Sequence, residues 1–72
     1  MARVLRVREV VAMLAADGWT LVRTRGSHRQ FRHHTKPGVV TVAGTDGLEM
    51  PRGTLRSIFR QAGLPWRYGG KR

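Results

Sequence analysis

The 72-residue sequence contains no cysteine and no long uninterrupted apolar run. Without thiols, the chain has neither a disulfide framework nor a thiolate–zinc site. Its first thirteen residues mix four charged side chains among the apolar ones, which is unlike a signal peptide or a membrane span. We therefore expect a single small domain, residues 1–72, that lies in the cytoplasm and not in a membrane.

Acidic residues are also scarce. Four Asp and Glu stand against fourteen Lys and Arg, which gives a formal net charge of +10. A small domain with this imbalance attracts polyanions. Twelve of the cations are arginine, whose planar guanidinium binds phosphate in a bidentate manner and stacks on bases. Nucleic acid is the favoured partner and an acidic protein is the alternative.

Apolar side chains repeat with helical periodicity in two segments, residues 7–17 and 52–62. Gly18 and Gly63 follow these segments, where a left-handed glycine commonly ends a helix. Each predicted helix has one apolar stripe: Val7, Val10, Val11 and Leu14 in the first, and Leu55, Ile58, Phe59 and Ala62 in the second.

Three segments between the helices are rich in β-branched and aromatic residues: 19–24, 28–34 and 39–43. Short turns join them, which predicts an antiparallel meander. The order α-β-β-β-α predicts an α+β fold in which two helices share one face of a three-stranded sheet. The core spans about residues 7–64, and residues 65–72 form a basic tail in which Trp66 is expected to pack over the core and Tyr68 could stack on bases.

All three histidines lie within residues 25–34. Side chains alternate along a strand, so if Phe31 faces the core, His28 and Arg32 face away from it. This orientation makes His28 accessible to a ligand, although it would equally suit a solvated residue at a strand end.

The histidines are poorly spaced for a metal site. His28 and His34 are separated by roughly 20 Å of strand, and His33 points to the opposite face from His34. The carboxylates are scattered along the chain, at Glu9, Asp17, Asp46 and Glu49. We therefore expect no metal and no cofactor, and a metal-dependent nuclease is disfavoured.

Phosphodiester cleavage without metal is possible if the substrate is RNA. The ribose 2′-hydroxyl can attack its own phosphorus when a general base removes its proton, and histidines suit this role near neutral pH. Arginines stabilise the charge that develops on the phosphate oxygens.

The second helix carries a row of cations. Arg52, Arg56 and Arg60 repeat at four-residue intervals, and no acidic residue in the helix pairs with them. The first turn, near Thr54, offers free backbone N–H groups to a phosphate. A solvated polar face is the alternative explanation.

Three blocks of the sequence resemble one protein family. They are Asp17-Gly18-Trp19, Gly26-Ser27-His28-x-x-Phe31-x-His33, and Arg52-Gly53-Thr54-Leu55-Arg56-Ser57-Ile58-x-x-Gln61-Ala62-Gly63-Leu64. In order and spacing they resemble the HicA-type toxins of bacterial and archaeal toxin–antitoxin modules, which are small mRNA interferases.

The resemblance implies a double-stranded-RNA-binding-domain-like fold and a metal-independent endoribonuclease that cuts mRNA and arrests translation. The family's catalytic histidine falls on His28. The implied partner is a HicB-type antitoxin, in a hetero-oligomeric complex. One departure is visible at Val42-Ala43-Gly44-Thr45, where family members often carry Val-Pro-x-His. If the missing histidine assists catalysis, cleavage by this protein is expected to be slower or differently selective.

The leading hypothesis is a ribonuclease toxin with His28 as general base or acid. The residues predicted to contact RNA are Arg25, Gly26, Ser27, Arg29, Arg32, Arg52, Thr54 and Arg56. One alternative is a non-catalytic RNA-binding module of the same fold that has lost its nuclease activity. Another is a basic protein whose function is to bind an acidic one.

Overall fold

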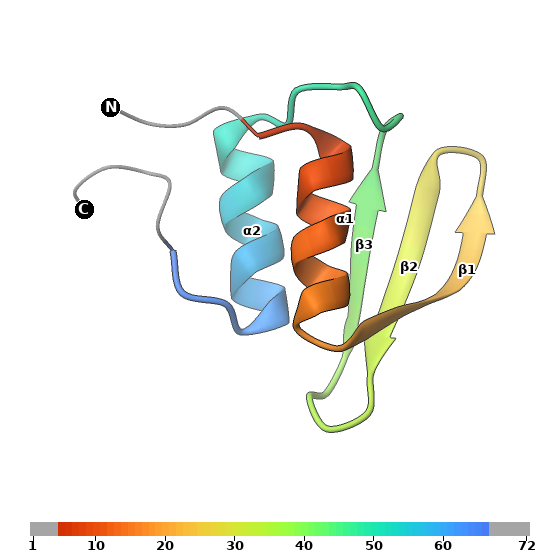
Figure 1. Ribbon diagram of the computed structural model, residues 1–72, viewed down its shortest axis with the longest axis vertical. Coiled ribbons are helices and arrows are strands. Elements are labelled where there is room, and N and C mark those ends of the chain that lie inside the picture. The colour runs from red at the N-terminus through yellow and green to blue at the C-terminus, as the bar shows by residue number, and fades with distance from the viewer. Residues whose placement is uncertain (1–4, 67–72) are drawn as a thin grey trace.

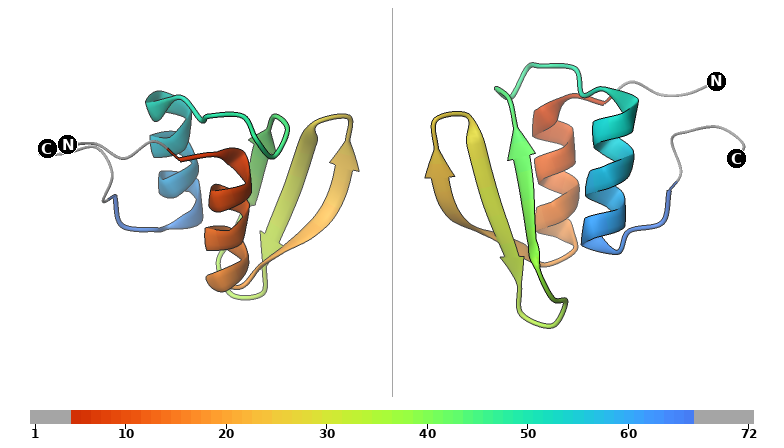
Figure 2. Two further views of the ribbon diagram at one scale, coloured as in Figure 1. Left: turned by 45° about the horizontal axis from the view of Figure 1, so that its top comes forward. Right: turned by 180° about the vertical axis from the view of Figure 1, so that it is seen from behind.

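The computed structural model describes residues 5–66. The elements follow in the order α1 (Val7–Ala16), β1 (Trp19–Arg25), β2 (His28–His33), β3 (Val39–Ala43) and α2 (Arg52–Ala62). The strands form one antiparallel sheet in the order β1-β2-β3. Both helices lie side by side on one face of this sheet (Figure 1). The view from behind shows the other face with no helix over it, and we call it the open face (Figure 2). The predicted α+β fold is confirmed.

The core forms between the helices and the covered face of the sheet. From the sheet, Phe31, Val40 and Val42 point into it, as strand alternation requires. From the helices come the two predicted stripes, of which only Val11 stays partly exposed. The buried apolar residues are Leu5, Val7, Val10, Leu14, Trp19, Phe31, Val40, Val42, Met50, Leu55, Ile58, Phe59 and Ala62.

A loop, residues 44–50, takes the place of a capping side chain at the start of α1. The sequence has no Ser, Thr, Asp or Asn at that position, and the structure places Arg6 there. The backbone N–H groups of Val7 and Arg8 instead donate to the carbonyls of Leu48 and Asp46, at 2.9 and 3.0 Å. Because these contacts satisfy donors that a helix N-terminus leaves free, they hold the loop against α1.

A hydrogen-bonded clamp joins the end of α1 to the sheet and to α2. Lys36 Nζ lies 2.6 Å from Asp17 Oδ2 and donates to the Ala62 carbonyl at 3.0 Å. The buried Trp19 donates its Nε1–H to the same Asp17 oxygen at 3.2 Å. His33 Nε2 lies 2.7 Å from the Asp17 carbonyl oxygen. We call Asp17, Trp19, His33 and Lys36 the Asp17 clamp.

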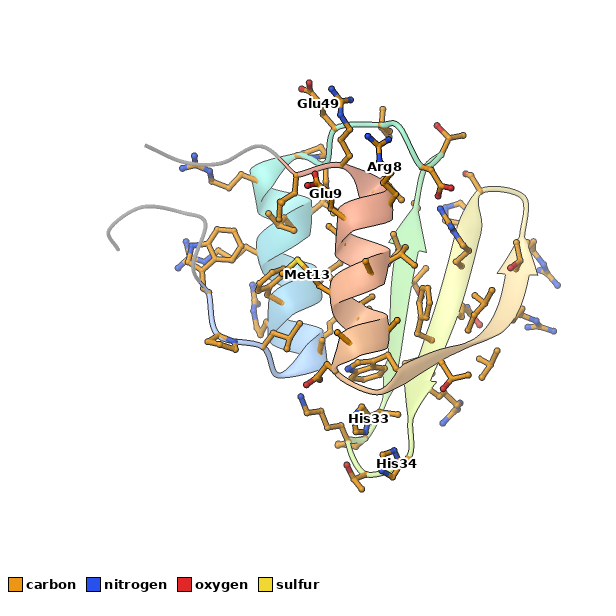
Figure 3. The ribbon with its side chains drawn as sticks, viewed as in Figure 1. Arg8, Glu9, Met13, His33, His34 and Glu49 are labelled. Carbon is orange, nitrogen blue, oxygen red and sulfur yellow. The ribbon has the colours of Figure 1, made fainter. Side chains whose placement is uncertain are left out.

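His33 has a structural role in this clamp. Its Nδ1 accepts the backbone N–H groups of Thr35 and Lys36, at 3.0 and 3.1 Å. The proton of a neutral ring therefore sits on Nε2, which donates to the Asp17 carbonyl. These bonds turn the chain away from the sheet, which explains why β2 ends at His33 and not at His34 as predicted. Figure 3 shows the rings of His33 and His34 at the end of the sheet that carries the β2–β3 turn, whereas Glu49 lies at the opposite end of the molecule.

Glycine is required at position 18 by both the backbone and the clamp. Its φ is 102°, and a Cβ atom there would lie 2.8 Å from His33 Nε2. We expect Gly18→Ala to lower the free energy of unfolding by about 1–3 kcal/mol, because it adds backbone strain and displaces His33. Gly26→Ala is the matched control, since its φ is 59° and no atom lies within 4 Å of the added Cβ. It should cost about 1 kcal/mol. Equal losses in urea unfolding would contradict the close approach to His33.

The Asp17 clamp also predicts a pH dependence of stability. The hydrogen bond from Lys36 holds the pKa of the Asp17 carboxyl below its ordinary value of 3.8. A lowered pKa stabilises the folded state above the ordinary value, and this contribution is lost as pH falls through the folded-state pKa. Asp17→Asn should therefore destabilise the protein at pH 7, and its difference from wild type should shrink below about pH 4. Thermal unfolding between pH 7 and pH 2.5 measures this.

Glu49→Gln is the control for that series. Glu49 pairs with Arg6 at 3.6 Å, and its side chain is 61% exposed. Exposed ion pairs contribute little to stability, so this variant should follow wild type at every pH. A constant difference between Asp17→Asn and wild type across the range would show that the carboxylate charge is not what stabilises the clamp.

Candidate nucleic-acid interface

A β-bulge in β1 sets which side chains reach the open face. Leu21 pairs with Phe31, but the next pair is Arg23 with Gln30, so Val22 is an extra residue. Strict alternation from the buried Trp19 would send Arg23 to the helix-covered face. The bulge shifts the alternation by one residue and places Arg23 on the open face instead. The same shift carries Arg25 to that face.

These arginines lie opposite the polar residues of β2. Arg25 pairs with His28, and Arg23 pairs with Gln30. On the other side of β2, Gln30 pairs with Thr41. Paired residues share a face of the sheet, so the five side chains form one group near the β1–β2 turn.

This group encloses a hollow of about 280 Å³, lined by Arg23, Arg25, His28, Gln30 and Thr41, which we call the His28 hollow. His28 is exposed at its edge, next to the two-residue turn Gly26–Ser27. The turn begins with a positive φ of 59° at Gly26, which suits a tight hairpin. A histidine, two guanidinium groups, an amide and a hydroxyl therefore line one accessible concavity.

The open face continues beyond the hollow toward the β2–β3 turn. Arg32 lies there, paired with Thr20 on β1 and with Val39 on β3. The orientation predicted for His28 and Arg32 is therefore observed. Along β2, His28, Gln30 and Arg32 follow one another on the open face, so Gln30 lies between Arg32 and His28.

Arg29 points to the opposite face from His28. Its Nη2 donates to Asp46 Oδ1 at 2.7 Å and to the Gly44 carbonyl at 3.3 Å. A second hollow, of about 530 Å³, surrounds this contact and is lined by Thr24, Gly26, Ser27, Arg29, Gly44, Thr45 and Asp46. We call it the Arg29 hollow. Arg29 was predicted to contact RNA together with Arg25 and Arg32, but the structure places it on the other face of the sheet from both of them.

Thr45, where the family often has a second histidine, also lines the Arg29 hollow. It does not line the His28 hollow. Gly26 and Ser27, in the β1–β2 turn, line the Arg29 hollow and not the His28 hollow.

The predicted contacts on α2 form a separate surface. Arg52, Thr54 and Arg56 are exposed along this helix, and none of them lines the His28 hollow. The guanidinium carbon of Arg56 lies 5.7 Å from the centroid of the Trp66 ring, and that ring packs edge-on against Phe59 at 5.5 Å. The packing expected for Trp66 is confirmed. Tyr68 and the rest of the predicted tail beyond residue 66 lie outside the described residues.

The remaining histidines do not join the candidate site. His33 belongs to the Asp17 clamp, and the exposed ring of His34 stacks on it with the centroids 4.8 Å apart. The prediction that these two side chains point to opposite faces is wrong, because β2 ends at His33 and the alternation does not extend to His34. Within residues 5–66, no group of three or more His, Asp or Glu side chains could hold a metal ion. Nor is any helix of that range long and apolar enough to cross a membrane.

Sequence reasoning missed three residues of the His28 hollow. The alternation around Phe31 puts Gln30 on the open face, and Thr41 could have been found from the length of the β2–β3 turn, which sets the register. Arg23 could not have been found in this way. Its orientation depends on the bulge, and the sequence Leu21-Val22-Arg23 carries no glycine to mark it.

Comparison with known proteins now adds to this geometry. A family model described as "HicA toxin of bacterial toxin-antitoxin" matches residues 7–64. A search of curated proteins finds no match. The matched range contains every described helix and strand and both hollows. The chain therefore belongs to the HicA toxin family, whose members are the toxins of bacterial toxin–antitoxin systems.

Proposed function

We propose that this protein is a metal-independent endoribonuclease that cleaves mRNA and thereby inhibits translation. The observation that carries the proposal is the His28 hollow, where Arg23 and Arg25 lie across the β1–β2 pair from Gln30 and His28. A proton acceptor thus stands beside two exposed cations on an accessible face. Membership of a toxin family supports a damaging activity of this kind.

The proposed reaction uses the nucleophile that RNA carries. His28 removes the proton of a ribose 2′-hydroxyl, and the oxygen attacks the adjacent phosphorus. The bond from phosphorus to the 5′-oxygen breaks, the leaving oxygen takes up a proton from water, and the products end in a 2′,3′-cyclic phosphate and a 5′-hydroxyl. Arg23 and Arg25 bind the non-bridging oxygens as their negative charge grows. DNA lacks the 2′-hydroxyl and is bound without being cut.

The other predicted contacts extend this surface. Arg32 continues it along the open face, and the exposed cations of α2, Arg52 and Arg56, bind the RNA backbone elsewhere. Thr54 assists at the start of α2, while Gly26 and Ser27 let the backbone of the turn approach the RNA. The net charge of +10 favours encounter with a polyanion and makes binding weaken steeply with salt.

A HicB-type antitoxin is the proposed protein partner, in a hetero-oligomeric complex located in the cytoplasm. Membership of a toxin–antitoxin family supports a paired partner. Because the open face is cationic around His28, an antitoxin that presents acidic groups there would both bind and block the hollow.

Replacement of His28 provides the direct test. His28→Ala should lower the rate of cleavage of a single-stranded RNA by about 10²–10⁴-fold, the usual contribution of a general base or acid. RNA binding should change little. Cleavage followed by gel electrophoresis, together with growth on expression in bacteria, measures the effect.

The matched control is His34→Ala, which removes an exposed histidine that does not line the hollow. It should keep wild-type cleavage and toxicity. Equal RNA decay by His28→Ala and wild type would remove His28 from the reaction. If wild type binds RNA but cleaves none, the protein is instead a non-catalytic RNA-binding module.

The bulge generates a second test of the same hollow. Arg23→Ala and Arg25→Ala should each slow cleavage by about 10- to 1,000-fold, the larger value being typical of a lost oxyanion donor. Arg8→Ala removes the same charge from an exposed position on α1 and should have little effect. If Arg8→Ala slows cleavage as much as Arg23→Ala, overall charge and not position accounts for the contribution of the arginines.

A further inference from the structure

We propose that the Arg29 hollow is a base-binding subsite that holds a guanine of the RNA, next to the phosphate at His28. The inference rests on the proposed function for its substrate class, RNA, and does not depend on turnover. It assigns a role to Arg29 and Asp46, which do not lie on the open face.

The position of the hollow suits a neighbouring nucleotide. The His28 hollow and the Arg29 hollow lie on opposite faces of the same hairpin, and only the turn Gly26–Ser27 separates them. Nothing lies within 4 Å of the place where a Gly26 side chain would begin. A single strand that crosses this bare turn therefore reaches both hollows. The volume of about 530 Å³ falls in the range of about 300–1,000 Å³ that is typical of small-ligand sites.

The charges in the hollow favour a base over a phosphate. Asp46 is one of only four acidic residues in the chain, and its side chain is 65% exposed. A carboxylate at this position repels a phosphate, whereas it accepts hydrogen bonds from the N–H groups of a base. The rest of the lining is glycine and hydroxyl-bearing residues, with Arg29 as the only cation among them.

The pairing of Arg29 with Asp46 matches the edge of guanine. Guanine presents one acceptor, O6, beside two donors, N1–H and N2–H. The guanidinium and carboxylate lie side by side, with Arg29 Nη2 2.7 Å from Asp46 Oδ1. Arg29 can donate to O6 while Asp46 accepts from the two N–H groups. Adenine has the opposite order of donor and acceptor on that edge, and the pyrimidines lack the two adjacent donors.

The subsite is held in place before a ligand binds. Arg29 is also fixed by the Gly44 carbonyl, and its side chain is only 21% exposed. The backbone N–H of Gly44 donates to the Ser27 carbonyl at 3.1 Å, which ties the loop to the turn. The carbonyl of Asp46 accepts from Arg8 N–H at the start of α1. Such preorganisation reduces the entropy that binding must overcome.

The test uses nuclear magnetic resonance on the full-length protein, with ligands that contain no phosphodiester bond to cleave. The four ribonucleoside 5′-monophosphates are titrated separately, and the backbone amides are followed. GMP should shift the amides of Ser27, Gly44, Thr45 and Asp46 at lower concentration than the other three. Asp46→Asn should weaken the preference for GMP by about 5- to 150-fold, the discrimination that one bidentate base contact supplies.

Two further variants make the result specific. Glu49 lies in the same loop as Asp46, but its carboxylate pairs with Arg6 and does not line the hollow. Glu49→Gln should therefore leave GMP binding unchanged. Thr45→Phe fills the hollow from an exposed position while both charged side chains remain in the chain, and should block GMP. If Asp46→Asn fails to fold, Thr45→Phe still tests whether GMP binds in this hollow.

Three results would overturn the subsite: equal shifts with all four nucleotides, shifts confined to the His28 hollow, or an unchanged preference in both Asp46→Asn and Thr45→Phe. Mapping of cleavage sites on a mixed RNA separates this proposal from the first one. Wild type should cut beside guanine, and Asp46→Asn should still cut but with less preference. If wild type cuts no RNA, the proposed nuclease function fails, while the titration still decides whether guanine binds.

Discussion

Side chains of a β-strand alternate between the two faces of a sheet, and the open face of this protein owes two of its arginines, Arg23 and Arg25, to one interruption of that rule. Val22 is an extra residue in β1, and beyond it the alternation is shifted. Arg23 and Arg25 consequently share a face with His28 instead of facing the helix layer.

The opposite end of the hairpin is held by the Asp17 clamp. One carboxylate receives Lys36 and Trp19, while the carbonyl of the same residue receives His33. These contacts join α1, the β2–β3 turn and the end of α2 in a chain that has no disulfide to do so. The clamp explains why two blocks shared with the family, Asp17-Gly18-Trp19 and the histidine at position 33, occur together. They meet in space and serve the fold, whereas His28 lies at the other end of the hairpin and takes no part in the clamp.

The two ends of the hairpin therefore differ. The Asp17 clamp holds one end, and at the other, where we propose the RNA site, the turn is two residues long and carries different groups on its two faces: histidine with arginines on one, and a single arginine–aspartate pair on the other. The first combination suits a phosphate that gains charge during a reaction. The second suits the edge of a base. The exposed cations of α2 lie on a separate surface.

The sequence by itself determined the fold and the accessible histidine. Helical stripes, short turns and the alternation around Phe31 are local patterns, and they predicted all five elements, two of them, 39–43 and 52–62, with the bounds that the structure gives. Only the tertiary structure decided the membership of each hollow. Arg23 joined His28 through a bulge, Arg29 left it for Asp46, and Thr45 lies in the hollow on the far face of the turn. The physical reason is that register and loop path are fixed by contacts between segments distant in sequence, which no local pattern of residues contains.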